Sequence, residues 1–559
     1  MFRSRWTRYF HFKKNKRGGF LMVRKKFLVL MLAGLFLLLV ACSNDEGKGK
    51  QPELDQEALD NVNKSDFPIV KDEIALKMFT AKSQVNANED WNDLLVWNTY
   101  EDQTNIDVEW TEQVTMDGLE EKRNLALASG TLPDAFFAAN ISNLDLYKYG
   151  QQGTFLELNE LIDEYAPNLK KFMEENPSVK KGMTFPDGKI YSMPALRDQD
   201  FLSVRIGARP WINENWLDKL GMKVPETTDD LYAYLKAVKE EDPNGNGKAD
   251  EIPYGGVNMD HLIGWVRGAY GLGANGVGDF DKDPNGDGLR FIPTSDGYKE
   301  MLEYLNKLYS EELIEQNIFS IEWGQFMANA AEGKYGLTTF YNPKKTFGGV
   351  EGDNYTNASA LKGPNGDQMY SNVVSPLFNN GAFVITKENP NPAAAVRWMD
   401  HFYSDEGAKL MYMGVEGKTF EEENGEFKYV DEIENSEEKN QLISKYLPWV
   451  GVNPPGVVKK KYFIGSEASE ESLKAAEDIK PYVPEDLWAE FTYTEDENKL
   501  LSSKGADIEK YVKEMRDKFI SGATPLSEWD NYVKTIEDMG LEEYMTIQED
   551  AYKRYEEAE

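Results

Sequence analysis

The clearest pattern in the chain is a helical one. Between residues 227 and 242 the apolar positions recur at the three- and four-residue spacing of one helix face; they are Leu231, Tyr234, Leu235 and Val238. Thr227 and Asp230 have the spacing of a capping box, which predicts where this helix begins. Residues 297–314 repeat the apolar pattern, and Pro392 stands where the first turn of a third helix is expected.

Three short runs are typical of strands instead. They are rich in apolar residues and lie at residues 67–80, 189–196 and 381–387. Helix and strand patterns alternate from Phe67 onward, which predicts an α/β architecture. No internal repeat and no long linker interrupts this part of the chain, so interwoven lobes are expected rather than independently folding halves.

The N-terminus breaks the α/β pattern. Basic residues precede an apolar run from Phe27 to Val40, which is too short to span a bilayer comfortably and is typical of a secretory signal peptide. The run ends in Leu-Val-Ala-Cys, which resembles a bacterial lipobox, and Cys42 is the only cysteine in the 559 residues. We therefore expect a signal peptide over residues 1–41, with Met22 as an alternative start, and a lipid (palmitate) on Cys42. An ordinary signal peptide followed by a chance cysteine is the alternative.

Residues 42–66 contain almost nothing to bury, and they predict a flexible tether. The protein is thus expected to be lipid-anchored at the extracytoplasmic face of the cell membrane, and a Gram-positive cell suits the tether best. The formal net charge is −35, although the ten Lys and Arg of the first 41 residues are accompanied by no acid. The remaining body is therefore strongly acidic and repels nucleic acid and anionic lipid, which excludes both as expected partners.

Residues 240–253 resemble the start of an EF-hand calcium loop, with a glycine at the position of its sharp turn. Pro253 stands where an EF-hand places its closing glutamate, so an adjacent acidic pair would have to complete the shell. The sequence predicts a structural Ca²⁺ held by Asp242, Asn244, Asn246, the Lys248 carbonyl, Asp250 and Glu251. A surface turn without metal is the alternative. A second Asp/Asn/Gly loop at 283–288 has no acid to complete a shell, and it predicts a turn.

Four separated stretches carry a family resemblance: residues 125–137, 187–196, 212–237 and 414–420. In this order, and after a lipobox, they resemble the extracellular solute-binding proteins (family 1) of bacterial ABC importers. The resemblance is to the large oligosaccharide-binding lipoproteins, similar to alginate-oligosaccharide-binding proteins, of which some carry calcium in a loop of the kind described. It covers nearly the whole mature chain, whereas each stretch alone is weak.

The resemblance implies a two-lobe periplasmic-binding-protein fold (type II, maltodextrin-binding-like) with interwoven lobes and a hinge. By analogy, lobe one holds residues 67–194 and 376–440, and lobe two holds residues 195–375 and 441–559. It also implies a monomer that captures an oligosaccharide between its lobes and delivers it to a membrane permease and its ATPase.

Sugar recognition needs flat apolar ring faces and planar polar groups. Aromatic residues in irregular segments are therefore the candidate ligand contacts, although burial is the commoner fate of any single aromatic. They are Trp265, Trp323 and Trp449 first, then Tyr270, Tyr341 and Tyr446. Arg205 and Arg267 could bind acidic sugars, but ion-pair or surface roles are favoured.

An enzyme is the main rival class. The three histidines are isolated, and no HExxH, nucleophile-elbow, P-loop or cysteine motif is present. We therefore expect no catalysis, although a glycosidase needs only two carboxylates and the chain has 97 Asp and Glu. A peptide or other polar solute as ligand, and a glycan sensor without transport, are the remaining alternatives.

Overall fold

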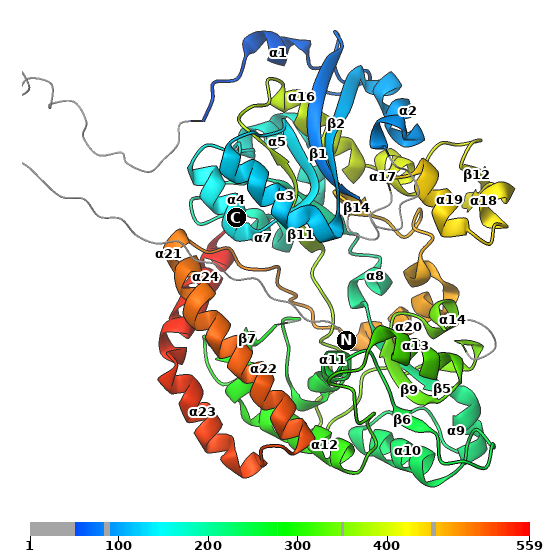
Figure 1. Cartoon of the computed structure of the whole chain (residues 1–559). Coiled ribbons are helices and arrows are strands. Elements are labelled where there is room, and N and C mark those ends of the chain that lie inside the picture. The colour runs from blue at the N-terminus through cyan, green and yellow to red at the C-terminus, as the bar shows by residue number, and fades with distance from the viewer. Residues whose placement is uncertain (1–50, 83–89, 277, 348–351, 449–453, 559) are drawn as a thin grey trace, which may run out of the picture. The chain divides into compact units, whose positions relative to one another are not determined.

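The computed structural model describes residues 51–82, 90–276, 278–347, 352–448 and 454–558 (Figure 1). The expected signal peptide and Cys42 lie outside these residues. Within them, no helix is both long and apolar enough to cross a membrane. The end of the expected tether differs from the prediction, because α1 (Gln56–Asn61) is helical. Leu59 and Val62 pack against the core there, since even two apolar side chains gain from burial.

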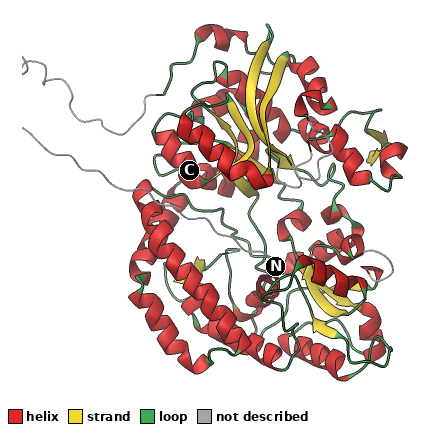
Figure 2. Ribbon diagram, in the orientation of Figure 1, coloured by secondary structure: helices red, strands yellow, loops and turns green. Residues whose placement is uncertain are grey.

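A six-stranded sheet has the strand order β14-β4-β11-β3-β1-β2 (Figure 2). Its strands are β1 (Ile74–Lys82), β2 (Ile106–Thr115), β3 (Ala135–Ile141), β4 (Met193–Arg197), β11 (Leu377–Ile385) and β14 (Gly456–Val458). The β1–β2, β1–β3 and β14–β4 pairs are parallel, and β11 is antiparallel to both of its neighbours. This sheet and the helices around it form lobe one.

A four-stranded sheet has the order β10-β5-β9-β6. Its strands are β5 (Arg209–Asn213), β6 (Ile252–Tyr254), β9 (Tyr335–Phe340) and β10 (Tyr355–Asn357). Around it lie α9 (Glu214–Leu220), α10 (Thr228–Glu240), α11 (Met259–Val266), α12 (Asp296–Ser310) and α13 (Trp323–Ala331). This sheet and its helices form lobe two.

The C-terminal helices join lobe two (Figure 1). They are α20 (Glu470–Ile479), α22 (Ala506–Ser521), α23 (Trp529–Asp538) and α24 (Leu541–Glu557). Ile508, Phe519 and Tyr532 are buried in the same hydrophobic core as α10 and α12. Helix α22 packs directly on α12, so these C-terminal helices stabilise lobe two.

The chain passes between the two sheets more than once, so the lobes are interwoven. Residues 198–208 lead from β4 to β5, and residues 358–376 lead from β10 back to β11. Residues 459–469 lead from β14 to α20, whose Ala476 and Ile479 lie in the core of lobe two. Strand β14 itself pairs with β4, which places Gly456–Val458 in lobe one although the analogy assigns residues from 441 onward to lobe two.

The local predictions are confirmed where the sequence carries a cap. Helix α10 begins after Thr227, and the capping box with Asp230 is present. Pro392 opens α16 (Pro392–Asp400) at the first turn. The strands differ at their ends: β1 begins only at Ile74, and the run expected from residue 189 becomes β4 at Met193. Pairing with neighbouring strands determines where each strand begins and ends, and amino-acid composition alone does not predict that pairing.

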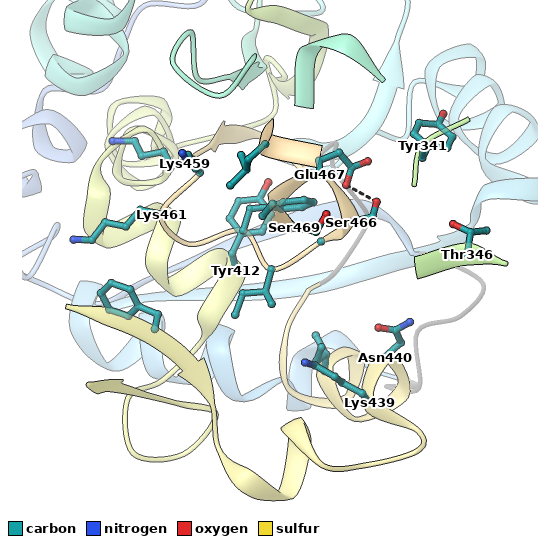
Figure 3. Close-up of a pocket in the computed structure, with 18 of the residues that line it drawn as sticks. Tyr341, Thr346, Tyr412, Lys439, Asn440, Lys459, Lys461, Ser466, Glu467 and Ser469 are labelled. Atoms are coloured by element: carbon teal, nitrogen blue, oxygen red, sulfur yellow. Dashed lines mark hydrogen bonds between the residues drawn. The ribbon is translucent and has the colours of Figure 1, made fainter. Parts of the chain in front are cut away.

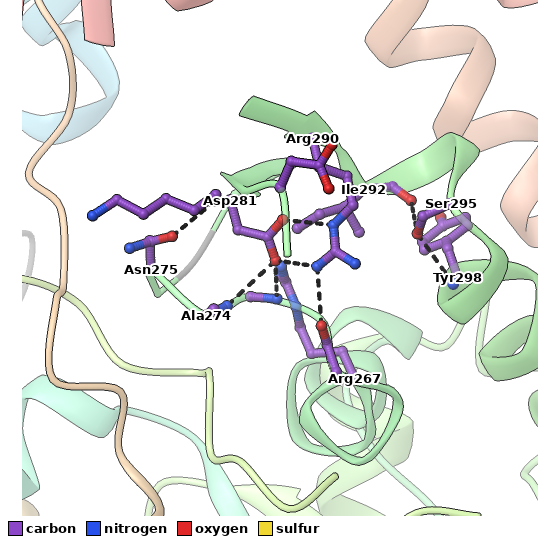
Figure 4. A network of polar contacts seen from close by, with 12 residues as sticks. Arg267, Ala274, Asn275, Asp281, Arg290, Ile292, Ser295 and Tyr298 are labelled. Atoms are coloured by element: carbon purple, nitrogen blue, oxygen red, sulfur yellow. Dashed lines mark hydrogen bonds and ion pairs between the residues drawn. The ribbon is translucent and has the colours of Figure 1, made fainter. Parts of the chain in front are cut away.

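The loop at 283–288 is the turn of a hairpin, as predicted. It joins β7 (Phe280–Lys282) to β8 (Leu289–Phe291), and the Asp283 amide donates to the Gly288 carbonyl at 2.9 Å. Figure 4 shows the carboxylate of Asp281 facing Arg290, with Nη2–Oδ2 at 2.6 Å and Nε–Oδ1 at 2.8 Å. The Gly273 amide also donates to Asp281. This ion pair, in which Asp281 is fully buried, fixes the hairpin to the body of lobe two.

Candidate functional site

A cavity of about 1770 Å³ is lined by residues of both lobes. Lobe two contributes residues that follow β6 and β9, together with the first turn of α13. Lobe one contributes α17 (Asp405–Met413), the hairpin β12–β13 (Phe420–Glu423, Glu426–Tyr429) and α19 (Lys439–Tyr446). Residues 459–461 and 463–469, in the connection between the lobes, also line it, together with Asp198 and Leu473. We call this space the interlobe cavity.

The lobe-two wall of the interlobe cavity is aromatic. Trp323 at the start of α13 is 56% exposed, and Tyr341 directly after β9 is 44% exposed. Phe340 lies between them, with ring centroids at 5.8 Å from Trp323 and 5.3 Å from Tyr341. Exposed ring faces of this kind can stack on the C–H face of a sugar.

The lobe-one wall carries a second aromatic group. Tyr412 packs edge-on against Phe463 at 5.7 Å, and both line the cavity. Phe427 of β13 also lines it, with the Lys461 ammonium 5.1 Å from its ring centroid. Figure 3 shows Tyr412 between Lys461 and the segment that carries Glu467, with Tyr341 across the cavity. A ligand in this space would therefore meet ring faces from both lobes.

Positive and negative charges along the cavity are nearly balanced, because its lining holds four lysines and five Asp or Glu residues, and two of these lysines form ion pairs. Lys459 forms an ion pair with Asp405, and Lys439 pairs with Glu434 at 2.7 Å. His261 is held by the Thr339 carbonyl, and burial lowers the pKa of this imidazole, so it is neutral at pH 7. The cavity is thus polar and close to neutral, although the chain as a whole is strongly acidic.

The structure separates the six aromatic residues singled out from the sequence. Trp323 and Tyr341 line the interlobe cavity. Trp265 is 0% exposed and its indole N–H donates to the Ser359 carbonyl at 2.8 Å, while Tyr270 is 6% exposed. Both belong to the lobe-two core, where packing leaves no ring face for a ligand. Tyr446 packs against the lobe-one core, and Trp449 lies outside the described residues.

Two cavity features escaped the sequence reasoning. Tyr412 lies on α17 and looks like a core residue in the sequence, and Phe463 lies in the connection that follows β14, where no periodicity marks it. Of the arginines that the sequence did single out, Arg205 donates to the carbonyls of Val374 and Gln199. Arg267 donates to the Gly278 carbonyl. These two arginines therefore stabilise the backbone.

The loop predicted to bind calcium lies between α10 and β6. Asp242 accepts hydrogen bonds from the amides of residues 245, 246 and 247, and Gly247 has φ +77°, which glycine adopts freely. Asn244 and Asn246 both donate to the same oxygen of Asp250 at 2.9 Å. The hydrogen bonds that Asp242 accepts from the backbone amides hold the pKa of its carboxyl below the usual value.

Glu251 closes this loop against Asp242. Burial raises the pKa of the Glu251 carboxyl, and the neighbouring Asp242 raises it further. Across the described residues, no three His, Cys, Asp or Glu side chains are grouped closely enough to hold a metal. An ion here would therefore also need the side-chain oxygens of Asn244 and Asn246 as ligands. Their amide nitrogens face Asp250 in the structure, and a half-turn of each amide group would place its oxygen there instead. The oxygen-rich donor set fits calcium on those terms.

The comparison with known proteins decides the family. Residues 96–417 match the bacterial extracellular solute-binding proteins. The chain belongs to this family. FusA of Streptococcus pneumoniae serotype 4, a fructooligosaccharide ABC transporter substrate-binding protein, is 30% identical over 558 residues, covering 95% of this chain and 98% of FusA. This match extends the relationship over nearly the full length of the chain.

Solved structures of FusA share the fold. The complex of S. pneumoniae FusA with kestose has a TM-score of 0.70 at 28% identity, covering 87% of this chain and 100% of that chain. An EF-hand mutant of FusA in complex with fructo-nystose gives the same values. The two-lobe fold expected from the resemblance is thereby confirmed.

Two relatives from Bacillus subtilis are more distant. The polygalacturonan/rhamnogalacturonan-binding protein YtcQ is 25% identical, covering 81% of this chain and 86% of YtcQ. Lipoprotein LipO is 25% identical, covering 76% of this chain and 82% of LipO. FusA and YtcQ are named for binding, and none of the three names denotes an enzyme.

Proposed function

We propose that the protein is the substrate-binding component of an ABC importer, and that it captures an oligosaccharide between its two lobes. The interlobe cavity carries this proposal, because it is large, close to neutral and lined by exposed ring faces. The binding of fructooligosaccharides by the relative FusA supports it. Trp323 and Tyr341 are the proposed stacking residues of lobe two.

The proposed mechanism is binding without catalysis. Ligand that contacts both walls of the interlobe cavity has more contacts when the lobes close, so it shifts the equilibrium toward the closed form. The connections at residues 198–208, 358–376 and 459–469 would bend during closure. The closed monomer then docks on the permease subunits, and their ATPase drives import.

We further propose lipid anchoring through Cys42 after removal of the signal peptide, at the outer face of a Gram-positive membrane. The lipobox-like sequence supports this, and so does the similarity to lipoprotein LipO. Labelled palmitate should enter the intact protein in cells and should be lost in Cys42→Ser.

A structural calcium ion in the loop from Asp242 to Glu251 is the proposed cofactor. The Asp, Asn and Glu side chains that contact one another in this loop support it, and so does the existence of an EF-hand mutant of the similar protein FusA. Asp242, Asn244, Asn246, the Lys248 carbonyl, Asp250 and Glu251 would hold the ion. It would fix the end of α10 to the start of β6, and its role would be structural.

Thermal unfolding of the chain from Ser43 tests the proposed ligand class. The panel contains kestose, maltotriose, trigalacturonate, alginate trimers and tripeptides. A ligand at 100 times its Kd adds about 2.7 kcal/mol to the free energy of unfolding, which shifts Tm visibly. A shift with a sugar supports the proposal, whereas a shift with peptides alone replaces it. Turnover of a bound sugar would show an enzyme.

A further inference from the structure

His261 lies on the lobe-two wall of the interlobe cavity and is partly exposed. It belongs to the first turn of α11, which begins after Asn258, and the Asn258 side chain accepts from the His261 amide at 3.0 Å. Helix α11 packs on β9. This packing brings the imidazole against the last residues of β9, where the chain leads into the aromatic part of the wall.

The contact with β9 determines the tautomer of this imidazole. Its Nδ1 lies 3.2 Å from the carbonyl oxygen of Thr339. A carbonyl oxygen can only accept a hydrogen bond, so Nδ1 has to carry a hydrogen and donate it. Burial lowers the pKa of the imidazole, which leaves the ring neutral at pH 7 with a single N–H. The other ring nitrogen, Nε2, is therefore unprotonated and can only accept.

Nε2 of His261 is an acceptor that the protein leaves unused. It has no hydrogen-bond partner in the described part of the chain, and it is not one of the fully buried polar atoms there that lack a partner. Because Nδ1 faces β9, the opposite edge of the ring, which carries Nε2, faces away from that strand. A donor in the interlobe cavity can therefore reach Nε2.

The aromatic neighbours of His261 favour a sugar hydroxyl as that donor. Thr339, which holds the imidazole, directly precedes Phe340 and Tyr341, and the Phe340 ring lies 5.8 Å from that of Trp323. A sugar that stacks on such rings through its C–H face turns its hydroxyl groups toward the edge of the stack. A hydroxyl can donate to Nε2, whereas an ether oxygen or a carboxylate cannot.

The carboxylates in the cavity lining are acceptors of a different kind. Asp405 and Glu434 are engaged by Lys459 and Lys439. A carboxylate also has to give up hydration of a full charge before it can accept from an uncharged hydroxyl, and that loss is costly in free energy. The neutral imidazole of His261 avoids this cost, so it suits an uncharged donor.

We propose that Nε2 of His261 accepts a hydrogen bond from a hydroxyl group of the sugar unit that stacks on the aromatic lobe-two wall, which makes His261 a specificity-determining residue. The bond from Nδ1 to Thr339 holds the ring in the orientation that presents Nε2. This inference rests on the proposed function, because it takes the interlobe cavity as the sugar site.

Nitrogen-15 NMR of the histidine side chains reads this bond directly. The chain from Ser43 contains two histidines, His261 and His401, so histidine-selective labelling shows two imidazoles. The probe is the sugar among kestose, maltotriose and trigalacturonate that gives the largest Tm shift. In the free protein, Nε2 of His261 should give the resonance of an unprotonated nitrogen. Saturating probe should move it toward the protonated range, while His401, which is absent from the cavity lining, should not shift.

Two substitutions separate the roles of the two ring nitrogens. His261→Asn keeps an amide that can donate to the Thr339 carbonyl but has no group at the Nε2 position. His261→Gln reaches the Nε2 position with its amide oxygen and lacks the Nδ1 donor. Isothermal titration should show affinity about 3-fold to 10-fold below wild type for His261→Asn, as expected for one neutral hydrogen bond. The loss should be smaller for His261→Gln.

His401→Asn is the matched control, because it removes the other imidazole from a position outside the cavity lining. It should bind the probe with wild-type affinity at a temperature where its Tm shows that it is folded. An equal loss of affinity in His401→Asn and His261→Asn would overturn the inference, because the effect would then not belong to the cavity.

The remaining outcomes distinguish this inference from the proposed function. A probe that binds without shifting the Nε2 resonance overturns the inference while sugar binding stands. Affinity in His261→Asn equal to or above that in His261→Gln also overturns it, because Nε2 would then contribute nothing to binding. Failure of all three sugars, and of the wider panel, overturns the proposed function and this inference with it.

Discussion

Exposure of individual tryptophans gives the sharpest prediction at the residue scale. Trp323→Ala should weaken oligosaccharide binding by about tenfold, because it removes an exposed ring face from the interlobe cavity. The free energy of unfolding should change by less than about 0.5 kcal/mol, as is usual for an exposed side chain. Titration calorimetry and denaturant unfolding measure the two effects.

Trp265→Ala is the matched contrast. It should lower the free energy of unfolding by about 3–5 kcal/mol, because the ring is fully buried and its N–H is bonded. The folded fraction should bind the sugar with wild-type affinity. Weakened binding in this folded fraction would return Trp265 to the list of ligand contacts.

A buried carboxyl predicts a pH-dependent stability. Glu315 accepts from Asn329 at 2.9 Å and from Tyr335 at 3.3 Å, and burial raises its pKa to about 6. The contribution of the protonated Glu315 carboxyl to the free energy of unfolding is fully present below about pH 4.5. It is lost as the pH rises through about 6. Glu315→Gln should therefore raise the free energy of unfolding at pH 7 by at most about 2 kcal/mol, and hardly at pH 4.

Denaturant unfolding at the two pH values measures this difference. Glu332→Gln, at an exposed carboxylate 61% accessible to solvent, is the control and should change stability little at either pH. Equal destabilisation by Glu315→Gln at both pH values would show that hydrogen bonding, and not charge, dominates there.

Sequence could select aromatic residues but could not sort them by exposure. Trp265 lies near the end of α11 and Trp323 begins α13, and their exposure depends on how these two helices pack against β9. Trp216 and Trp398, which lie on the apolar faces of α9 and α16, are both buried.

At the scale of elements, the calcium loop predicts a crossover in stability. Without calcium, the Glu251 carboxyl has a raised pKa because of burial and of Asp242. The protonated form then contributes stability at low pH, which is lost as pH rises above the usual glutamate range. In excess chelator at pH 7, Glu251→Gln should therefore be more stable than wild type. With calcium the order should reverse, because the ion needs the carboxylate.

Thermal unfolding in calcium and in chelator measures that crossover. Glu240→Gln changes an exposed carboxylate two residues before the loop, and it should show no calcium dependence beyond that of wild type. Identical Tm values for wild type in calcium and in chelator would leave the loop as a surface turn.

Elements with strong local chemistry were predictable, and elements set by pairing were not. The capping box of α10 and the proline of α16 fix helix starts through contacts within one turn. Strand β14 has only three residues and exists because it pairs with β4 across about 260 residues of chain. No periodicity within three residues could have placed it in lobe one.

At the scale of the whole molecule, alternating helices and strands indicated the fold class, while the two lobes came from the family resemblance. The reason is physical: the lobes are built from segments far apart in the chain, and hydrophobic patterns do not report which strands share a sheet. The interwoven connections could be expected only because no linker divides the chain.

Closure of the lobes is the prediction that belongs to this scale. The chain from Ser43 has no cysteine, so Glu160→Cys in lobe one and Glu240→Cys in lobe two can be labelled specifically as a donor and acceptor pair. Ligand that contacts both walls should raise the transfer efficiency, because it binds the closed form more tightly than the open one. A Glu121→Cys and Glu160→Cys pair, both in lobe one, should not respond. Saturating sugar that releases heat but leaves the interlobe efficiency unchanged would mean that the cavity binds without closing.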